Sequence, residues 1–266
     1  MSKGDSIGTP SRGMPDHLNR RTGKTGYGID DPRTIAELLI AGVLAVAVGI
    51  IISAYTATSN PRTAAAALIG GPGVGFLILV VAAALFWSSR LGKKREMTKL
   101  INGLPWGGEE VVLDLGCGRG FSAVTTAKKL QTGFAVGMDT WPKARVSGND
   151  PLSVLANAAE ENVGTRVFAV KAYSTQLPFA DKSLDAVISG VAIHSLVPRK
   201  QRQNLFAEMT RVLKDGGRVG ILDAGNGIEY STILKEMGMT DVEMHRLRFS
   251  SFPPFHMVTA RKPYSG

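Results

Sequence analysis

The chain has 266 residues, of which 31 are Lys or Arg and 22 are Asp or Glu, so its formal net charge is +9. This length leaves room for one ordinary domain of about 150 residues plus additional segments. The one cysteine, Cys117, leaves no partner for a disulfide within the sequence and excludes a cysteine-rich zinc site. The basic residues gather on both sides of an uncharged region, which favours a membrane surface over nucleic acid as their partner.

The chain divides into four regions by composition. Residues 1–33 are polar, basic and rich in Gly and Pro, so we predict a disordered tail. Residues 34–89 are nearly uncharged, residues 90–110 form a basic juxtamembrane linker or helix, and residues 111–266 read as a mixed globular domain.

The first apolar segment, from Thr34 to Thr58, carries a single charge, Glu37, close to its start. At about 1.5 Å per residue this segment is longer than the roughly 30 Å of bilayer hydrocarbon. It is too long, and starts too far into the chain, for a secretory signal peptide. We therefore predict a transmembrane helix.

The second apolar segment, from Thr63 to Ser89, contains Gly-Gly-Pro-Gly at residues 70–73. It either spans the bilayer together with its alanine run or is partly re-entrant, because such residues are tolerated where neighbouring helices satisfy the backbone. Only Arg62 lies between the segments, whereas many Lys and Arg residues flank the pair. The positive-inside rule then predicts a multi-pass membrane protein with both termini and the globular domain in the cytoplasm. The alternative, a helical hairpin buried in a soluble protein, is disfavoured by two successive uncharged stretches of this length.

In the globular part, short apolar runs alternate with helical patterns. This alternation predicts an α/β fold with a Rossmann-like, doubly wound, mostly parallel sheet. Two extended runs around Pro253 and Pro254 predict an antiparallel hairpin at one sheet edge. The expected strands are 111–115, 134–139, 166–170, 184–189 and 218–223, and the expected helices are 121–130, 150–163 and 201–213.

The ligand of such a sheet lies beyond the carboxyl ends of its strands, here near residues 114–120, 139–141 and 189–194. The glycine turn after the first strand lacks the lysine of a phosphate-binding P-loop, and its third glycine, Gly120, falls one position early for a dinucleotide fingerprint. An acid followed by Gly-x-Gly-x-Gly suits a zwitterionic ligand whose ammonium group Asp114 helps to hold, directly or through water. Asp139 could accept both hydroxyls of an adenosine ribose, with Thr140 or Trp141 beside the adenine.

The motifs "VLDLGCGRG", "GMD", "LPFADKSLDAVISGVAIHSL", "EMTRVLKDGGRVGILD" and "FHMVTARKP" occur in this order. Together they resemble the class I S-adenosylmethionine-dependent methyltransferases, and within them the small-molecule and lipid branch called type 11. The resemblance covers residues 111–263 and implies S-adenosylmethionine as cofactor. The residues that it places at the cofactor are Asp114, Gly116, Cys117, Gly118 and Gly120 in the loop, Asp139 at the ribose, and Ser189 and Gly190 at the sulfonium.

One departure from the family pattern concerns the adenine. Members often have an acid near the end of the third strand, where this chain has Tyr173 and Ser174. Adenine recognition could then use the Ser174 hydroxyl, a backbone group or stacking on Tyr173.

His194 is the candidate general base, because an unperturbed histidine titrates near neutral pH. The alternative is a structural histidine that closes a turn over the cofactor. Cys117 is interpreted as a packing residue, and no group of residues has metal-ligand spacing. The polar stretch 140–151 is a candidate lid.

We therefore expect a membrane-anchored methyltransferase that acts on a small or lipophilic acceptor such as a quinone, isoprenoid, sterol or lipid amine. Two alternatives stay open: a methyltransferase of soluble or protein substrates that its helices merely localise, and a non-catalytic membrane scaffold that keeps the fold.

Overall fold

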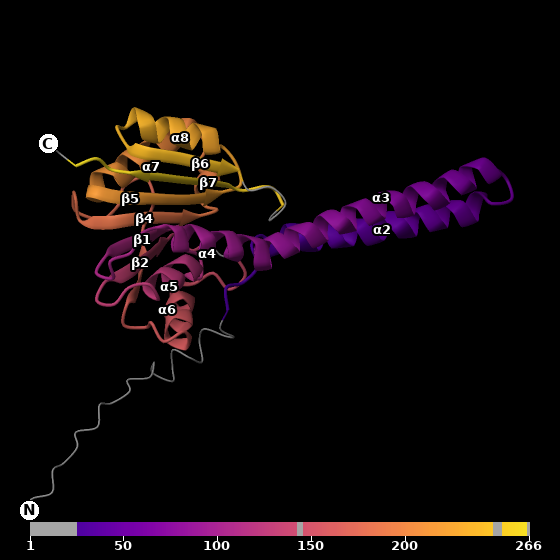
Figure 1. The fold of residues 1–266 in the computed structure, drawn as a ribbon. Helices are drawn as coiled ribbons and strands as arrows, with labels where there is room; N and C mark the ends of the chain where they lie inside the picture. The colour runs from indigo at the N-terminus through magenta and orange to yellow at the C-terminus, as the bar shows by residue number, and fades with distance from the viewer. Residues whose placement is uncertain (1–25, 143–145, 247–251, 265–266) are drawn as a thin grey trace, which may run out of the picture.

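The computed structural model describes residues 26–142, 146–246 and 252–264. Figure 1 shows a rod of two long helices that projects from an α/β domain. The rod consists of α2, Pro32–Thr56, and α3, Pro61–Trp87. The predicted tail, residues 1–33, has its first 25 residues outside the described part of the chain.

Each helix of the rod begins at a proline that follows a capping residue. The side chain of Asp31 accepts a hydrogen bond from the Thr34 amide at 3.4 Å, and that of Asn60 accepts one from the Thr63 amide at 3.2 Å. Proline suits the first helical position because its missing N–H would have no partner there. These caps explain why both helices start two residues earlier than we predicted.

Four glycines of the rod lie where its two helices touch: Gly42, Gly49, Gly71 and Gly75. A Cβ atom added to Gly71 would come within 2.5 Å of the Gly49 Cα atom, so only glycine allows this approach. The helix α3 runs through Pro72 without a break. Gly71 therefore lies at the contact between two continuous helices, and the choice between a full span and a partly re-entrant segment stays a prediction.

Both rod helices are long and apolar enough to cross a membrane, and they bury little of their surface. Only 17% and 11% of their most apolar windows are buried. The side chains of Ile40 and Phe76, for example, are 61% and 69% exposed. A hairpin in the core of a soluble protein would be mostly buried, so the rod presents its apolar surface to its surroundings.

The α/β domain contains a seven-stranded sheet of order β3-β2-β1-β4-β5-β7-β6. Strands β1 to β5 run parallel, whereas β7 pairs antiparallel with both β5 and β6. The predicted Rossmann-like sheet and its antiparallel edge hairpin are both confirmed. The strands are β1 Val111–Leu115, β2 Phe134–Asp139, β3 Val167–Lys171, β4 Leu184–Gly190, β5 Leu213–Asp223, β6 Thr240–Arg246 and β7 His256–Arg261.

Helices cover both faces of the sheet, as a doubly wound fold requires (Figure 1). Alternate residues of β1 point to opposite faces: Leu113 packs with α7 and α8, and Val112 packs with α4. The helix α8 follows a loop after β5 and was not among the predicted elements. The helices are α4 Lys93–Gly103, α5 Phe121–Ala127, α6 Pro151–Glu160, α7 Arg199–Val212 and α8 Gly227–Glu236, with a short turn η2 at Ile193–Ser195.

The rod and the α/β domain share one helix. The segment from Pro61 to Gly103 is helical throughout, with a wider π-type turn, η1, at Ser88–Gly92. Its last part, α4, buries Met97 and Ile101 against the sheet. The predicted juxtamembrane linker or helix, residues 90–110, is therefore largely a core helix of the domain.

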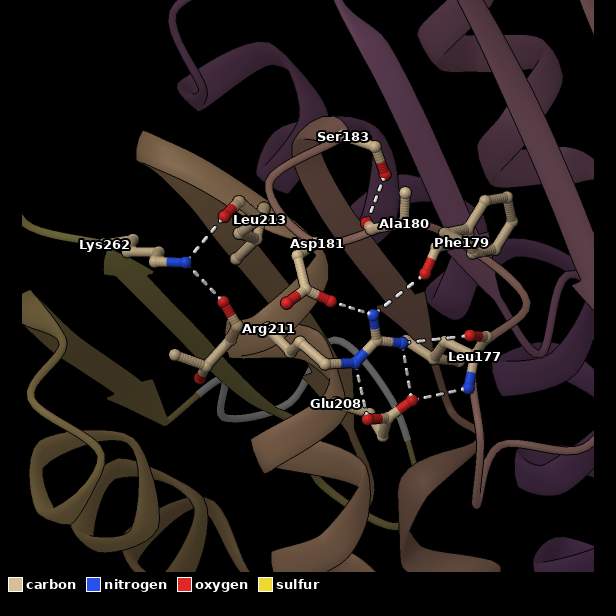
Figure 2. A network of polar contacts seen from close by, with 10 residues as sticks. Leu177, Phe179, Ala180, Asp181, Ser183, Glu208, Arg211, Leu213 and Lys262 are labelled. Carbon is tan, nitrogen blue, oxygen red and sulfur yellow. Dashed lines mark hydrogen bonds and ion pairs between the residues drawn. The ribbon is translucent and has the colours of Figure 1, made fainter.

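Arg211 of α7 fixes the loop that follows β3 (Figure 2). Its guanidinium donates to the carboxylates of Glu208 and Asp181, and to the carbonyls of Leu177 and Phe179. These bonds raise the pKa of Arg211, and the pKa of Glu208 is lowered mainly by its bond from Arg211. This network holds the part of the loop that leads into β4, near the point where β5 begins.

Candidate functional site

The glycine turn after β1 depends on backbone conformations that side chains rarely adopt. Gly116 and Gly120 have φ angles of 71° and 83°. A Cβ atom on Gly116 would lie 2.3 Å from the Ala192 Cβ atom, and one on Gly120 would lie 2.7 Å from the Val154 Cγ1 atom. Gly116 therefore lets the turn pass the chain after β4, while Gly120 lets α5 pack on α6.

A cavity of about 860 Å³ opens at the carboxyl ends of β1, β2 and β4. Its volume lies in the range of small-molecule and cofactor sites. The structure brings most of the predicted site residues together here. Those lining the cavity are Gly116, Cys117, Gly118, Asp139, Thr140, Tyr173, Ser174, Gly190 and His194.

Asp139 is held in place by two backbone amides. One carboxylate oxygen accepts from the Gly118 amide at 2.9 Å, and the other accepts from the Trp141 amide at 2.8 Å. Each oxygen keeps a further lone pair for another donor. The residue thus fits the two hydroxyls of a ribose, and it ties β2 to the glycine turn.

Four predicted residues lie behind the cavity wall. The Trp141 indole is buried and its Nε1 donates to the Gly118 carbonyl at 2.7 Å, so it supports the turn from outside the cavity lining. The Ser189 hydroxyl, also buried, donates to the Leu115 carbonyl at 2.9 Å. The other two are Asp114 and Gly120. Thr140, Ser174 and the 75% exposed Tyr173 remain the predicted residues beside an adenine.

Asp114 is a buried carboxylate with a free oxygen. One oxygen accepts from the Ala123 amide at 2.9 Å, and among the described residues the other has no hydrogen-bond partner. Burial raises the pKa of Asp114 to about 7. A half-satisfied acid behind a glycine turn fits a ligand that brings an ammonium group.

Cys117 packs against β2. A Cβ atom on Gly137 would lie 2.9 Å from the Cys117 sulfur. Burial raises the pKa of the Cys117 thiol, so the sulfur stays protonated. This agrees with the predicted packing role.

His194 forms a dyad with Asp223, a residue that sequence analysis missed. Its ring Nδ1 lies 2.7 Å from one Asp223 oxygen, and its amide donates to the other oxygen at 2.9 Å. The His194 side chain is 40% exposed and lines the cavity, whereas Asp223 is buried. The carboxylate favours the tautomer with a proton on Nδ1, which leaves Nε2 able to accept one. Asp223 ends β5. Its place at the carboxyl edge of the sheet could have identified it as a candidate site residue from the sequence.

A second missed feature is the segment 26–31, which we term the strap. The Gly26 amide donates to the Asn157 side chain at 2.8 Å, and the Ile29 amide donates to the Ser147 hydroxyl at 2.9 Å. The Tyr27 ring meets the Phe121 ring edge-on, with centroids 5.0 Å apart. These residues belong to the predicted disordered tail, which is therefore ordered from residue 26. The strap is held by contacts with α5, α6 and the loop before α6. Its sequence has no apolar periodicity from which this order could have been predicted.

The strap and α4 bring charged groups to the cavity. The Lys93 ammonium lies 3.1 and 3.3 Å from the two carboxylate oxygens of Asp30. The Lys94 ammonium lies 5.0 Å from the centre of the Tyr27 ring, and burial lowers the pKa of Lys94. Part of the predicted lid, residues 146–149, lies beside the strap, and residues 143–145 of that stretch are outside the described residues.

In the portions of the chain that the structure describes, no group of three His, Cys, Asp or Glu side chains could hold a metal ion.

Comparison with known proteins agrees with this geometry. Residues 112–217 match the family described as "Methyltransferase domain". The chain is 38% identical over 115 residues to the arsenite methyltransferase of Halobacterium salinarum, an alignment covering 43% of this chain and 27% of the relative. It is 32% identical over 115 residues to the demethylmenaquinone methyltransferase of Lactiplantibacillus plantarum, covering 42% and 44%. The chain thus spans less than half the length of these two curated relatives.

Solved structures share the fold at low sequence identity. A geranyl diphosphate methyltransferase in complex with S-adenosylmethionine superposes with a TM-score of 0.52 at 14% identity, over 73% of this chain and 91% of that one. The cyclase SpnF superposes with a TM-score of 0.54 at 15% identity, over 65% and 82%. Matches this distant establish the fold alone.

Residues 112–217 thus match a methyltransferase domain, the named relatives are methyltransferases, and a solved methyltransferase shares the fold of the α/β region. The family match begins at residue 112, so it includes neither the rod nor the strap.

Proposed function

We propose that this chain is a membrane-anchored methyltransferase that transfers a methyl group to a small or lipophilic acceptor. The observation that carries the proposal is the extent of the cavity. Its lining runs from the glycine turn to Asp31 and Ser89, which adjoin the rod helices α2 and α3. An acceptor could therefore reach the site at the foot of the exposed apolar rod.

We propose S-adenosylmethionine as the cofactor. When bound, it would supply an activated methyl group on a positively charged sulfur, so the protein mainly aligns the acceptor and excludes water. Gly116, Gly118 and Asp139 would hold the cofactor against the sheet. His194 would take a proton from an acceptor hydroxyl at Nε2, and the Asp223 carboxylate would stabilise the resulting imidazolium.

The chemistry of the acceptor is supported by two features. Curated relatives include methyltransferases named for demethylmenaquinone and, in Arabidopsis thaliana, for 2-phytyl-1,4-beta-naphthoquinone, the latter 30% identical over 133 residues, covering 50% of this chain and 48% of the relative. The rod presents apolar side chains such as Leu39 and Ile40 to its surroundings. We favour a membrane-dissolved acceptor that carries an ionisable hydroxyl, as a reduced quinone does.

The orientation of the protein in the membrane is also part of the proposal. Arg33 lies at the start of α2, and Arg90, Lys94 and Arg95 follow the rod, whereas Arg62 lies at the start of α3, beside the turn between the two helices. The positive-inside rule then places both ends of the rod and the methyltransferase domain in the cytoplasm, with the turn outside.

Methyl transfer from tritium-labelled cofactor to extracted membrane lipid tests this function with the full chain. Asp139→Ala should abolish both cofactor binding and transfer. His194→Ala should lower the turnover rate by about 10²- to 10⁴-fold while cofactor affinity is kept. Asp223→Asn should show a smaller loss of the same kind. Equal turnover in the Asp139→Ala variant would contradict the cofactor assignment. An unchanged turnover rate in the His194→Ala variant would show that His194 has a structural role and is not the general base.

A non-catalytic scaffold is the second candidate, favoured by Tyr173 and Ser174 where the family often has an acid. Calorimetric titration with S-adenosylhomocysteine separates the two, because a scaffold that lost the reaction through this site would not bind it. A water-soluble acceptor is the other alternative, tested by comparing turnover on soluble and lipid acceptors. The full chain is needed, since a truncation at Ser89 would remove the strap from the cavity wall.

A further inference from the structure

Three cationic side chains line the cavity within the described residues: Lys93, Lys94 and Arg119. Lys94 lies over the rings of Tyr27 and Phe121, at 5.0 and 5.8 Å from their centres. Arg119 donates to the Ser147 carbonyl at 3.0 Å. The ammonium of Lys93 is engaged by a carboxylate, that of Asp30 in the strap.

Lys93 reaches the part of the cavity that lies beside the glycine turn. A Cβ atom on Gly190 would lie 4.0 Å from the Lys93 Cε atom and 3.4 Å from the Ser122 hydroxyl. Gly190 ends β4, the strand paired with β1. Lys93 is also close enough to Asp114 for its positive charge to favour the ionised carboxylate. The ammonium of Lys93 and the carboxyl group of Asp114 thus both lie near the glycine turn, Lys93 in the cavity lining and Asp114 behind it.

We propose that Lys93 binds the carboxylate of the cofactor, and that Asp30 forms an ion pair with the same ammonium when the cofactor is absent. This inference rests on the proposed function. The exchange replaces one carboxylate by another, so Lys93 never loses its counter-charge. Asp30 is 35% exposed, which lets water solvate it once it is displaced. The strap itself stays anchored through Tyr27 and through the Ile29 amide.

Competition of this kind has a direct consequence for affinity. The cofactor must displace an internal carboxylate, so its apparent affinity is lower than the cavity alone would give. The effect is confined to ligands that carry the amino-acid group. A ligand made of the adenosine and thioether only does not meet Lys93.

The test is calorimetric titration of the full chain in detergent with two ligands, S-adenosylhomocysteine and 5′-methylthioadenosine, which lacks the amino-acid group. Lys93→Met should weaken binding of S-adenosylhomocysteine about tenfold or more, because a charge-assisted hydrogen bond is lost. Asp30→Asn should strengthen it about threefold or more by removing the competitor. Binding of 5′-methylthioadenosine should stay unchanged in both variants, which also shows that the cavity is folded.

Two controls sharpen the result. Lys93→Arg keeps the charge and should retain most of the affinity for S-adenosylhomocysteine. Lys129→Met changes an exposed lysine at the end of α5 and should alter neither ligand. A Lys93→Met variant that weakens both ligands equally, or neither, overturns the inference, as does an Asp30→Asn variant that binds S-adenosylhomocysteine no more tightly. A wild-type chain that binds neither ligand instead refutes the proposed function itself.

Discussion

The rod and the methyltransferase domain both contain long apolar stretches, yet they use them in opposite ways. In the domain, strand residues such as Leu113 and Ile188 are fully buried between helices. In the rod, residues such as Ile51 and Phe76 are 65% and 69% exposed. Apolar sequence therefore dictates removal from water but not the partner, which is protein in one region and, by our proposal, lipid in the other.

The boundary between the two regions lies within one helix. Between Pro61 and Trp87 the helix is apolar on all sides, whereas α4 is amphipathic and buries Met97, Leu100 and Ile101. The π-type turn η1 lies between these two parts, and buries Ser88 and Gly92. A local change of helical winding at this point re-aims the side chains of α4 relative to those of α3. The rod is thus continuous with the core of the domain.

The largest difference between the rod and the domain is expected when one phenylalanine is truncated in each. Phe206→Ala in α7 should lower the free energy of unfolding of the domain by about 3–5 kcal/mol, because it leaves a cavity in the core. Phe76→Ala in α3 should change it by less than about 0.5 kcal/mol, since that ring packs on little of the protein. Chemical denaturation in detergent, followed by near-ultraviolet circular dichroism, measures both. Similar losses would mean that the rod is part of the folded core.

A second pair tests what holds the rod together. Gly71→Leu should push α2 and α3 apart, because its side chain meets the Gly49 backbone, at a cost of about 1–3 kcal/mol. Gly73→Leu is the control, since nothing lies within 4 Å of a Cβ atom there. Distances between spin labels placed at the exposed residues Ile40 and Leu77 report the separation. A rod that keeps its spacing in Gly71→Leu would refute this close packing.

The smallest expected effect is a dependence of the domain's stability on pH, because the domain buries the carboxyl group of Asp114. The unfolded chain releases the Asp114 proton near its ordinary pKa, whereas the folded domain keeps it up to about pH 7. The folded state thus binds more protons in this window, so stability falls as pH rises, by about 1.4 kcal/mol per unit at most. Near Asp114, Lys93 weakens the shift and Asp139 strengthens it.

Thermal unfolding of the cofactor-free chain between pH 5 and 8 measures this slope. Asp114→Asn should flatten it, whereas Glu109→Gln, at an exposed carboxylate, should leave it unchanged. The opposite sign, with stability rising toward pH 7 through Asp114, would contradict a raised pKa.

The parts of this protein that depend on near neighbours in the chain could be predicted from its sequence. Alternating apolar runs specify the strands, and the glycine turn follows from backbone needs within one strand–turn–helix unit. Asp139 was identified by its place at the end of the next strand. The length and uncharged character of residues 34–89 likewise specify two long apolar helices without any tertiary information.

Which distant residues meet depends on how the helices and strands pack in three dimensions. His194 finds Asp223 across 29 positions, and Lys93 finds Asp30 across 63. The same packing places the Trp141 indole behind the glycine turn and holds the polar strap in place. These contacts leave no periodic signal in the chain, because they are made by single side chains from separate elements that the folded sheet and the helix running out of the rod bring to one edge.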